Sequence, residues 1–326
     1  MTSTPETAAR SVQRGRLSRV GEQLAVPVAI VVAIIIGAFL SDRFLTLGNL
    51  LNVLTSMSIV GIVSVGMAVV LISGGLADLS VPATVAAGAI VTLAAQPVLG
   101  AGSIVLAVIV GLLIGTINGL LVGYAKANPI IATLGVSTAC LGFVQAFLGG
   151  SIVYGHDKAL VDFVNSRPLG IPLILIVFVV VAVLGHMQLT RTVWGRQIFA
   201  VGGNYAAAEA STVRVRRLKA SAFMLTAGLA SMSGAYIGLS LNVAQPLIGT
   251  GYEFDAITAV VVGGISLLGG AGSISRALLG VLFVQLLTNI LVLEGVPDQV
   301  QGIAKGTLIA LAVGLDVWFR NRGGRR

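Results

Sequence analysis

The side chains that could contact a solute inside the apolar segments of this chain are mostly uncharged. Amide side chains stand at Asn118, Asn242, Gln285 and Asn289, within or at the ends of apolar runs. Amides donate and accept hydrogen bonds without carrying charge, so these four residues suit a pathway for a neutral, hydroxyl-rich solute. The same residue types also hydrogen-bond between closely packed membrane helices. Both interpretations stay open for each residue.

Motifs for covalent chemistry are missing from the sequence. It contains no GxxxxGK[ST] nucleotide loop, no HExxH, no GxSxG and no Cys/His metal spacing. The chain is therefore predicted to be no enzyme and to hold no cofactor or metal, and a membrane-embedded enzyme is the least favoured function. Lys305 and Asp316 are the two ionisable residues placed well inside predicted spans, with Lys305 expected to extend toward the interface and Asp316 to lie near the cytoplasmic rim. Because buried carboxylates and histidines are typical of proton-coupled carriers, this pattern argues against ion coupling.

The composition requires a membrane environment for these residues. Of 326 residues, 56% are hydrophobic and 10% are charged, with a mean hydropathy of +1.01. A soluble domain carries about a quarter charged residues, so soluble enzymes, nucleic-acid-binding domains and secreted modules are excluded. The net charge of +8 would suggest nucleic acid in a soluble protein, but here its placement indicates orientation.

The apolar runs predict an all-α bundle, because they lack the alternation of barrel strands. Ten spans of about 20 residues are expected, forming one transmembrane domain over 22–319 between a tail at 1–21 and a basic tail at 320–326. The predicted spans are 23–41, 49–72, 79–95, 101–124, 129–149, 171–189, 218–241, 255–270, 274–293 and 299–319. The glycine-rich eighth span is expected to be broken or re-entrant. Sixteen of the 20 basic residues then fall in segments on one side, which predicts that both termini are cytoplasmic in a cell inner membrane.

Two segments between spans have distinctive sequences. SGGLADLSVP, after the second span, predicts a tight turn in which Asp78-Leu79-Ser80 caps the following helix. Residues 190–219 form the largest internal polar segment, with six basic residues and a single acidic one, Glu209. A short helix is expected to begin near Asn204 in this segment. It is interpreted either as a lipid-headgroup-binding surface or as a docking element for a cytoplasmic partner.

The order of several motifs resembles the permease subunits of ribose-type ATP-binding-cassette sugar importers. They are VLISGGLADLSV, GTINGLLVGYAKANPIIATLG, GRQIFAVGGNYAAAEASTVRVRRLK, SMSGAYIGLSLNVAQPLIGTGYEFDAITAVVVGGISLLGGAGSI and VQGIAKGTLIALAVGLD, which together span nearly the whole apolar region. The resemblance implies the fold of such a permease and a pore made with a second copy or a paralogue. It also implies a cytoplasmic ATPase that holds the ATP and Mg, and an extracytoplasmic sugar-binding protein.

The resemblance also implies roles for particular residues. The ATPase would receive a coupling helix with its flanks, namely Asn204, Tyr205, Ala206, Ala207, Ala208, Glu209, Ala210 and Ser211. Acidic residues in outer loops would face the binding protein, namely Asp42, Asp157, Asp162, Glu253, Asp255 and Asp298. Two departures from the family pattern stand out: Ala77 and Pro82 change the usual GGIDLS segment, and Ser211-Thr212 replaces a Ser-Gly pair.

The expected function is ATP-driven import of a monosaccharide such as a ribose-type pentose, with the sugar and membrane lipid as partners and no nucleic acid. Alternatives are an importer permease for another small polar solute, such as a polyol, a furanosyl signal molecule or a nucleoside, and a stand-alone secondary carrier. The identity of the solute and the choice between a homodimeric and a heterodimeric pore stay open.

Overall fold

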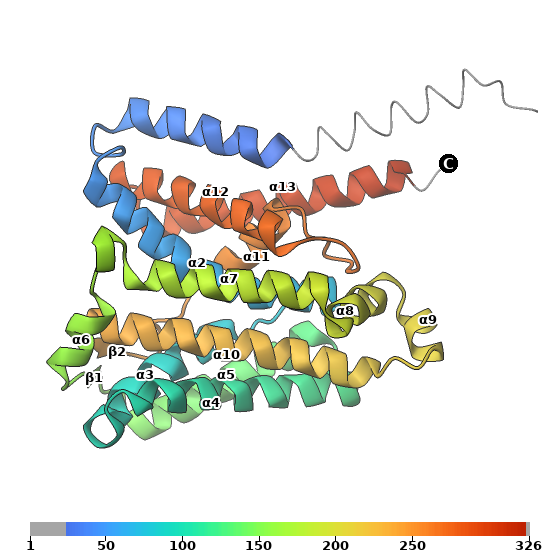
Figure 1. Ribbon diagram of the computed structural model, residues 1–326, viewed down its shortest axis with the longest axis horizontal. Coiled ribbons are helices and arrows are strands. Elements are labelled where there is room, and N and C mark those ends of the chain that lie inside the picture. The colour runs from blue at the N-terminus through green and yellow to red at the C-terminus, as the bar shows by residue number, and fades with distance from the viewer. Residues whose placement is uncertain (1–23, 324–326) are drawn as a thin grey trace, which may run out of the picture.

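The computed structural model describes residues 24–323, and these form a bundle of long helices (Figure 1). The first helix covers Leu24–Leu40. The helices that follow, up to the first strand, are α2 Leu47–Ile72, α3 Val81–Leu99, α4 Gly102–Gly119 with a π-helical extension Leu120–Tyr124, and α5 Pro129–Leu148. After strand β1 Val153–Tyr154 come α6 Lys158–Val164, a 3₁₀ turn Pro168–Gly170, α7 Leu173–Arg191, α8 Val193–Gly203, α9 Tyr205–Ala210 and α10 Val215–Leu241. Strand β2 Val243–Ala244, α11 Tyr252–Val262, α12 Ile274–Leu293 and α13 Asp298–Gly323 complete the fold.

Local signals in the sequence account for where these helices start and stop. Asn128 accepts hydrogen bonds from the N–H groups of the first turn of α5, and Pro129 follows at the first helical position. Gly149 ends α5 in the left-handed conformation, which costs glycine little. Gly100 separates α3 from α4 with a φ of 50°, between the predicted spans 79–95 and 101–124. Ser273 caps α12 through its hydroxyl oxygen.

Helix α10 lies at the centre of the bundle against α2, α3 and α4, and small residues make these contacts possible. A methyl group on Gly88 of α3 would overlap the carbonyl oxygen of Ser231 on α10, and one on Gly234 would overlap the Val85 carbonyl oxygen. The Ser231 hydroxyl donates to the Ala107 carbonyl oxygen of α4 at 2.6 Å. Close approach of backbones allows dispersion contacts and interhelical hydrogen bonds to hold membrane helices together without a hydrophobic driving force.

Seven helices in the described residues are long and apolar enough to cross a membrane: α2, α3, α4 with its extension, α5, α7, α10 and α12. The other three predicted spans correspond to the 17-residue helix Leu24–Leu40, the 11-residue α11 and the long α13. Helix α11 ends at Val262, and residues 263–273 are not helical, so the predicted interruption of the eighth span is present. An all-α membrane bundle is therefore confirmed, while the count of ten crossings stays a prediction.

The two ends of the bundle differ in structure (Figure 1). At one end, β1 and β2 pair antiparallel, with Val153 opposite Ala244 and Tyr154 opposite Val243, and α6 lies beside them. At the opposite end are α8 and α9, which contain most of the segment 190–219. The end of α13 points the same way as α9. The tail predicted at 1–21 lies outside the described residues, and helix α13 continues through Gly323 into the predicted tail at 320–326.

Candidate functional site

The short helix expected near Asn204 is present as α9. The Asn204 side-chain oxygen accepts a hydrogen bond from the Ala207 N–H at 3.0 Å, and this caps the helix. Ser211 ends it by donating its hydroxyl to the Ala208 carbonyl oxygen at 2.7 Å. Polar groups at both ends thus stabilise a six-residue helix that would be too short to form in isolation.

One face of α9 is available to a partner. Ala206, Ala207 and Ala210 are exposed, whereas Ala208 points into the protein and is buried. Methyl groups add little width to a helix, so its backbone can approach the walls of a receiving groove closely. The geometry suits a helix that inserts into another protein.

Glu209, the acidic residue of this segment, contacts two side chains, and one of these also contacts α10. The Glu209 carboxylate lies 3.7 Å from the Lys126 ammonium nitrogen of the α4–α5 connection. It also accepts a hydrogen bond from the Tyr205 hydroxyl at 3.3 Å. The Lys219 ammonium lies 5.1 Å from the centre of the Tyr205 ring, within cation–π distance. These contacts fix the orientation of α9 relative to α10.

A buried polar cluster joins the α2–α3 connection to α4. The Ser80 hydroxyl donates to Asp78 Oδ1 at 2.6 Å and accepts from Asn118 Nδ2 at 2.7 Å. Asp78 Oδ1 also accepts from the Ser80 N–H at 2.9 Å, which forms a turn just before α3. The tight turn is therefore present, but the predicted cap was wrong, because Ser80 is the N-cap residue of α3 and no side chain in the described part of the chain bonds to the N–H groups of its first turn. Asp78 Oδ2 and Asn118 Oδ1 have no hydrogen-bond partner among residues 24–323, although both atoms are buried. Two unpartnered acceptors in one cluster linked through Ser80 favour a donor-rich group there, such as water or a solute hydroxyl.

The other three predicted pathway residues lie elsewhere. Asn242 caps the end of α10 in the left-handed conformation, beside the small sheet. Asn289 exchanges two hydrogen bonds with Asn49 of α2, at 2.8 and 2.9 Å. Gln285 is buried one helical turn before Asn289 on α12. The structure therefore brings Gln285 and Asn289 close together but not into contact with Asn118 or Asn242.

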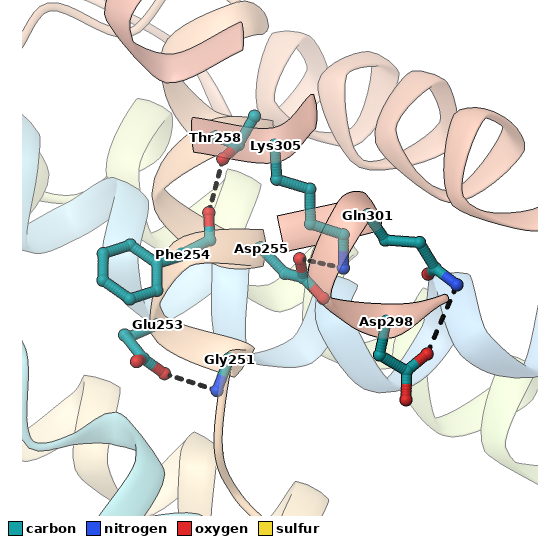
Figure 2. A network of polar contacts seen from close by, with 8 residues as sticks. All are labelled: Gly251, Glu253, Phe254, Asp255, Thr258, Asp298, Gln301 and Lys305. Atoms are coloured by element: carbon teal, nitrogen blue, oxygen red, sulfur yellow. Dashed lines mark hydrogen bonds and ion pairs between the residues drawn. The ribbon is translucent and has the colours of Figure 1, made fainter. Parts of the chain in front are cut away.

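A mostly buried ion pair is the main feature that the sequence did not predict. Lys305 of α13 lies 2.7 Å from Asp255 in the first turn of α11, with side-chain exposures of 19% and 14% (Figure 2). The neighbouring Glu253 is also buried, and its carboxylate accepts the Gly251 N–H at 3.0 Å. The placement of Glu253 and Asp255 in an outer loop was therefore wrong, as was the expectation that Lys305 reaches toward the interface.

Glu253 and Asp255 lie inside the protein because of the path that the chain takes before α11. Residues 242–251 fold back into the bundle, so that a methyl group on Gly249 would overlap the Pro82 carbonyl oxygen at the start of α3. Helix α11 consequently begins inside the protein rather than at its surface. The available sequence signal was the opposite charge of Asp255, at the start of the eighth predicted span, and Lys305, inside the tenth, since a charge inside a membrane protein needs a partner.

Comparison with known proteins identifies the type of membrane protein. Residues 49–313 match the family model described as "Branched-chain amino acid transport system / permease component". The chain belongs to this permease family. It is a multi-pass membrane protein of the importer permease type.

Named relatives resemble the permease over most of its length. It is 37% identical to the ribose import permease protein RbsC of Escherichia coli (strain K12) over 295 residues, covering 89% of this chain and 92% of the relative. It is 38% identical to the ribose import permease protein RbsC of Bacillus subtilis (strain 168), covering 87% and 89%. It is 33% identical to the autoinducer 2 import system permease protein LsrD of Escherichia coli (strain SMS-3-5), covering 90% and 92%. No solved structure matches the permease.

Reversing the charge of Glu209 tests the role of α9. In Glu209→Lys the contact with Lys126 becomes repulsive and Tyr205 loses its carboxylate acceptor, so we expect α9 to lose its orientation and the copurified ATPase to fall at least severalfold. Asp162→Lys is the matched control, because Asp162 pairs with Lys158 in α6, at the opposite end of the bundle. Copurification of a full complement of ATPase with Glu209→Lys, together with normal stimulation of ATP hydrolysis by substrate, would exclude the docking role.

Proposed function

We propose that this permease is the membrane subunit of an ATP-driven importer for a ribose-type monosaccharide. The observation that supports the substrate class is the 37–38% identity to two proteins named as ribose import permeases, over nearly 90% of the chain. The exposed alanine face of α9 supports docking of a cytoplasmic ATPase. ATP and Mg would bind in that partner, and an extracytoplasmic binding protein would deliver the sugar.

In this proposal the chain itself moves solute by a change of shape. Two ATPase subunits would dock on the α9 helices of two permease copies, or of one copy and a paralogue. A change in the distance between the two ATPase subunits would then move the α9 helices and, with them, the membrane helices. Alternating exposure of a pathway to the two sides of a membrane is a two-state shift of packed helices. Asn118 and Asp78 offer hydrogen-bond acceptors to solute hydroxyls, whereas Gln285, Asn289 and Asn242 are the further candidates on the pathway.

Two alternatives have specific support. The 33% identity to an autoinducer 2 permease supports import of a furanosyl signal molecule by the same machinery. A stand-alone secondary carrier gains some support from the mostly buried Asp255–Lys305 pair, because intramembrane charges are common in ion-coupled transport. The exposed α9 face argues for the importer, since a carrier that works alone has no use for a docking helix.

Transport measurements in proteoliposomes test the proposal. Vesicles containing the permease, its cognate ATPase and internal ATP, with the binding protein outside, should accumulate labelled ribose, and omission of the ATPase or of ATP should abolish accumulation. Unlabelled autoinducer 2 and polyols are added as competitors to define the solute. Substantial uptake by the permease alone would support the carrier instead.

Two leucine substitutions test the pathway residues. Asn118→Leu and Asn289→Leu should each lower the initial rate of uptake by about tenfold, the effect of losing roughly 1.4 kcal/mol of interaction with a solute hydroxyl, while the assembled complex is still recovered. Thr116→Val on α4 is the control for Asn118, because the Thr116 hydroxyl bonds only to the Leu112 carbonyl oxygen of its own helix. Unchanged uptake in both leucine variants would assign the two amides to helix packing.

A further inference from the structure

Three glycine-containing segments that are distant in the sequence meet immediately before α9. They are the α2–α3 connection at Gly74, the end of α8 at Gly202 and Gly203, and the α11–α12 connection at Gly269 and Gly270. The Gly270 N–H donates to the Ile72 carbonyl oxygen at the end of α2, at 2.9 Å. We call these five glycines the glycine junction.

The contacts within the glycine junction are made by backbone alone. A methyl group on Gly269 would lie 2.8 Å from the Gly74 Cα, and one on Gly270 would lie 2.5 Å from the Gly203 Cα. A methyl group on Gly202 would overlap the Ile72 carbonyl oxygen. Gly74, Gly269 and Gly270 also have φ values of 73°, 87° and 73°, a region that side chains disfavour. Within the part of the chain that the structure describes, no side chain lies between the three segments at these points, so a displacement cannot be absorbed by a change of rotamer.

Each of the three segments is connected along the chain to a different candidate functional element. Gly203 directly precedes Asn204, the cap of α9. Gly74 lies four residues before Asp78, the residue in the buried cluster with Ser80 and Asn118. The segment containing Gly269 and Gly270 joins α11, which holds the Asp255 ion pair, to α12. Beneath the junction, Ile72, Val201 and Ile265 are buried in one apolar cluster.

We propose that the glycine junction is the element through which α9 positions the α2–α3 and α11–α12 connections, so that ATP-driven displacement of α9 is transmitted to the buried Asp78 cluster and to α11. This inference rests on the proposed function, because it assigns a path for motion that an ATPase would supply. The residues of the junction are positioning residues, and none of them contacts the solute.

Adjacent glycines of α8 provide a matched pair of variants. Gly202→Ala places a methyl group against the Ile72 carbonyl oxygen, whereas a methyl group on Gly203 meets nothing within 4 Å. In complexes that copurify with the ATPase, Gly202→Ala should keep basal ATP hydrolysis but lower the amount of sugar taken up per ATP hydrolysed at least tenfold. Gly203→Ala should keep the wild-type ratio. A wild-type ratio in Gly202→Ala would overturn the inference.

A distance measurement tests the same inference without filling the junction. Spin labels are attached to Thr212→Cys, just after α9, and Leu268→Cys, beside the junction, in a Cys140→Ser background; Thr212 and Leu268 are both exposed. The distance between the labels should stay constant when the assembled complex binds ATP, because the junction holds the two segments together. A shift of several ångströms on ATP binding would show that α9 moves independently and would overturn the inference.

The outcomes separate this inference from the proposed function. If wild-type vesicles show no ATP-driven uptake, the proposed function fails, and the label distance still reports whether α9 and the α11–α12 connection move together. If wild-type vesicles transport sugar but Gly202→Ala transports it with the same coupling ratio, the glycine junction alone is excluded.

Discussion

Asp255→Asn and Lys305→Met are each expected to destabilise the permease by about 3 kcal/mol, the lower end of the range for breaking a buried pair, because either change leaves one charge of the mostly buried Asp255–Lys305 pair without its partner. The pair joins the first turn of α11 to α13, so its loss should also loosen the contact between these helices. The combined variant Asp255→Asn/Lys305→Met should recover most of the lost stability, since replacing both charges removes the unpaired one. Thermal unfolding of the purified protein in lipid nanodiscs measures the three variants.

An exposed ion pair provides the control for this experiment. Lys158 and Asp162 lie 2.6 Å apart on α6, with side-chain exposures of 86% and 62%. Surface pairs contribute about 0–1 kcal/mol, so Lys158→Met should leave the unfolding temperature nearly unchanged. Two results would contradict a paired role for Asp255 and Lys305. One is a loss of stability in Asp255→Asn/Lys305→Met that equals the sum of the losses in the two single variants. The other is a loss of stability in each single variant that is no larger than that in Lys158→Met.

Gly88→Ala is expected to have the second large effect, about 3 kcal/mol of destabilisation, which is at the upper end of the usual range for overpacking. The added methyl group would overlap the Ser231 carbonyl oxygen, so α3 and α10 would have to move apart. That movement would also stretch the hydrogen bond from the Ser231 hydroxyl to the Ala107 carbonyl oxygen of α4. The yield of monodisperse protein and its unfolding temperature report the effect.

Gly48→Ala is the control that separates the effect of overpacking on stability from the effect of helix propensity. Alanine favours a helix over glycine by about 1 kcal/mol, and a methyl group on Gly48 in the first turn of α2 meets nothing within 4 Å. This control should therefore be neutral or slightly stabilising. Equal stability of Gly88→Ala and Gly48→Ala would mean that α3 and α10 do not need their close approach.

Some elements of the candidate site were predictable because they depend on neighbours in the chain. Asn204 caps α9 through the N–H three residues later, and Asp78 accepts from the N–H two residues later, both of which follow from local backbone geometry. The change of chain direction at Gly100 and the end of helix α11 at Val262 likewise follow from local sequence, because glycines stand at both points and an apolar run of limited length precedes each. The roles assigned to Asn242, Gln285 and Asn289 stay predictions, and only Asn118 among the four amides lies in a cluster with unpartnered acceptors.

An apolar helical bundle and a short alanine-rich helix after Asn204 could be predicted from the sequence alone, and both are present. These features depend on composition, on the length of uncharged runs and on contacts between near neighbours. Two features could be seen only in the folded chain: the pairing of Asp255 with Lys305, 50 residues away in the sequence, and the meeting of Gly74, Gly202 and Gly270 before α9. The physical reason is that the sequence around a glycine or a carboxylate does not show whether the residue will lie in a surface loop or in a buried contact. That depends on which distant residue the fold places next to it.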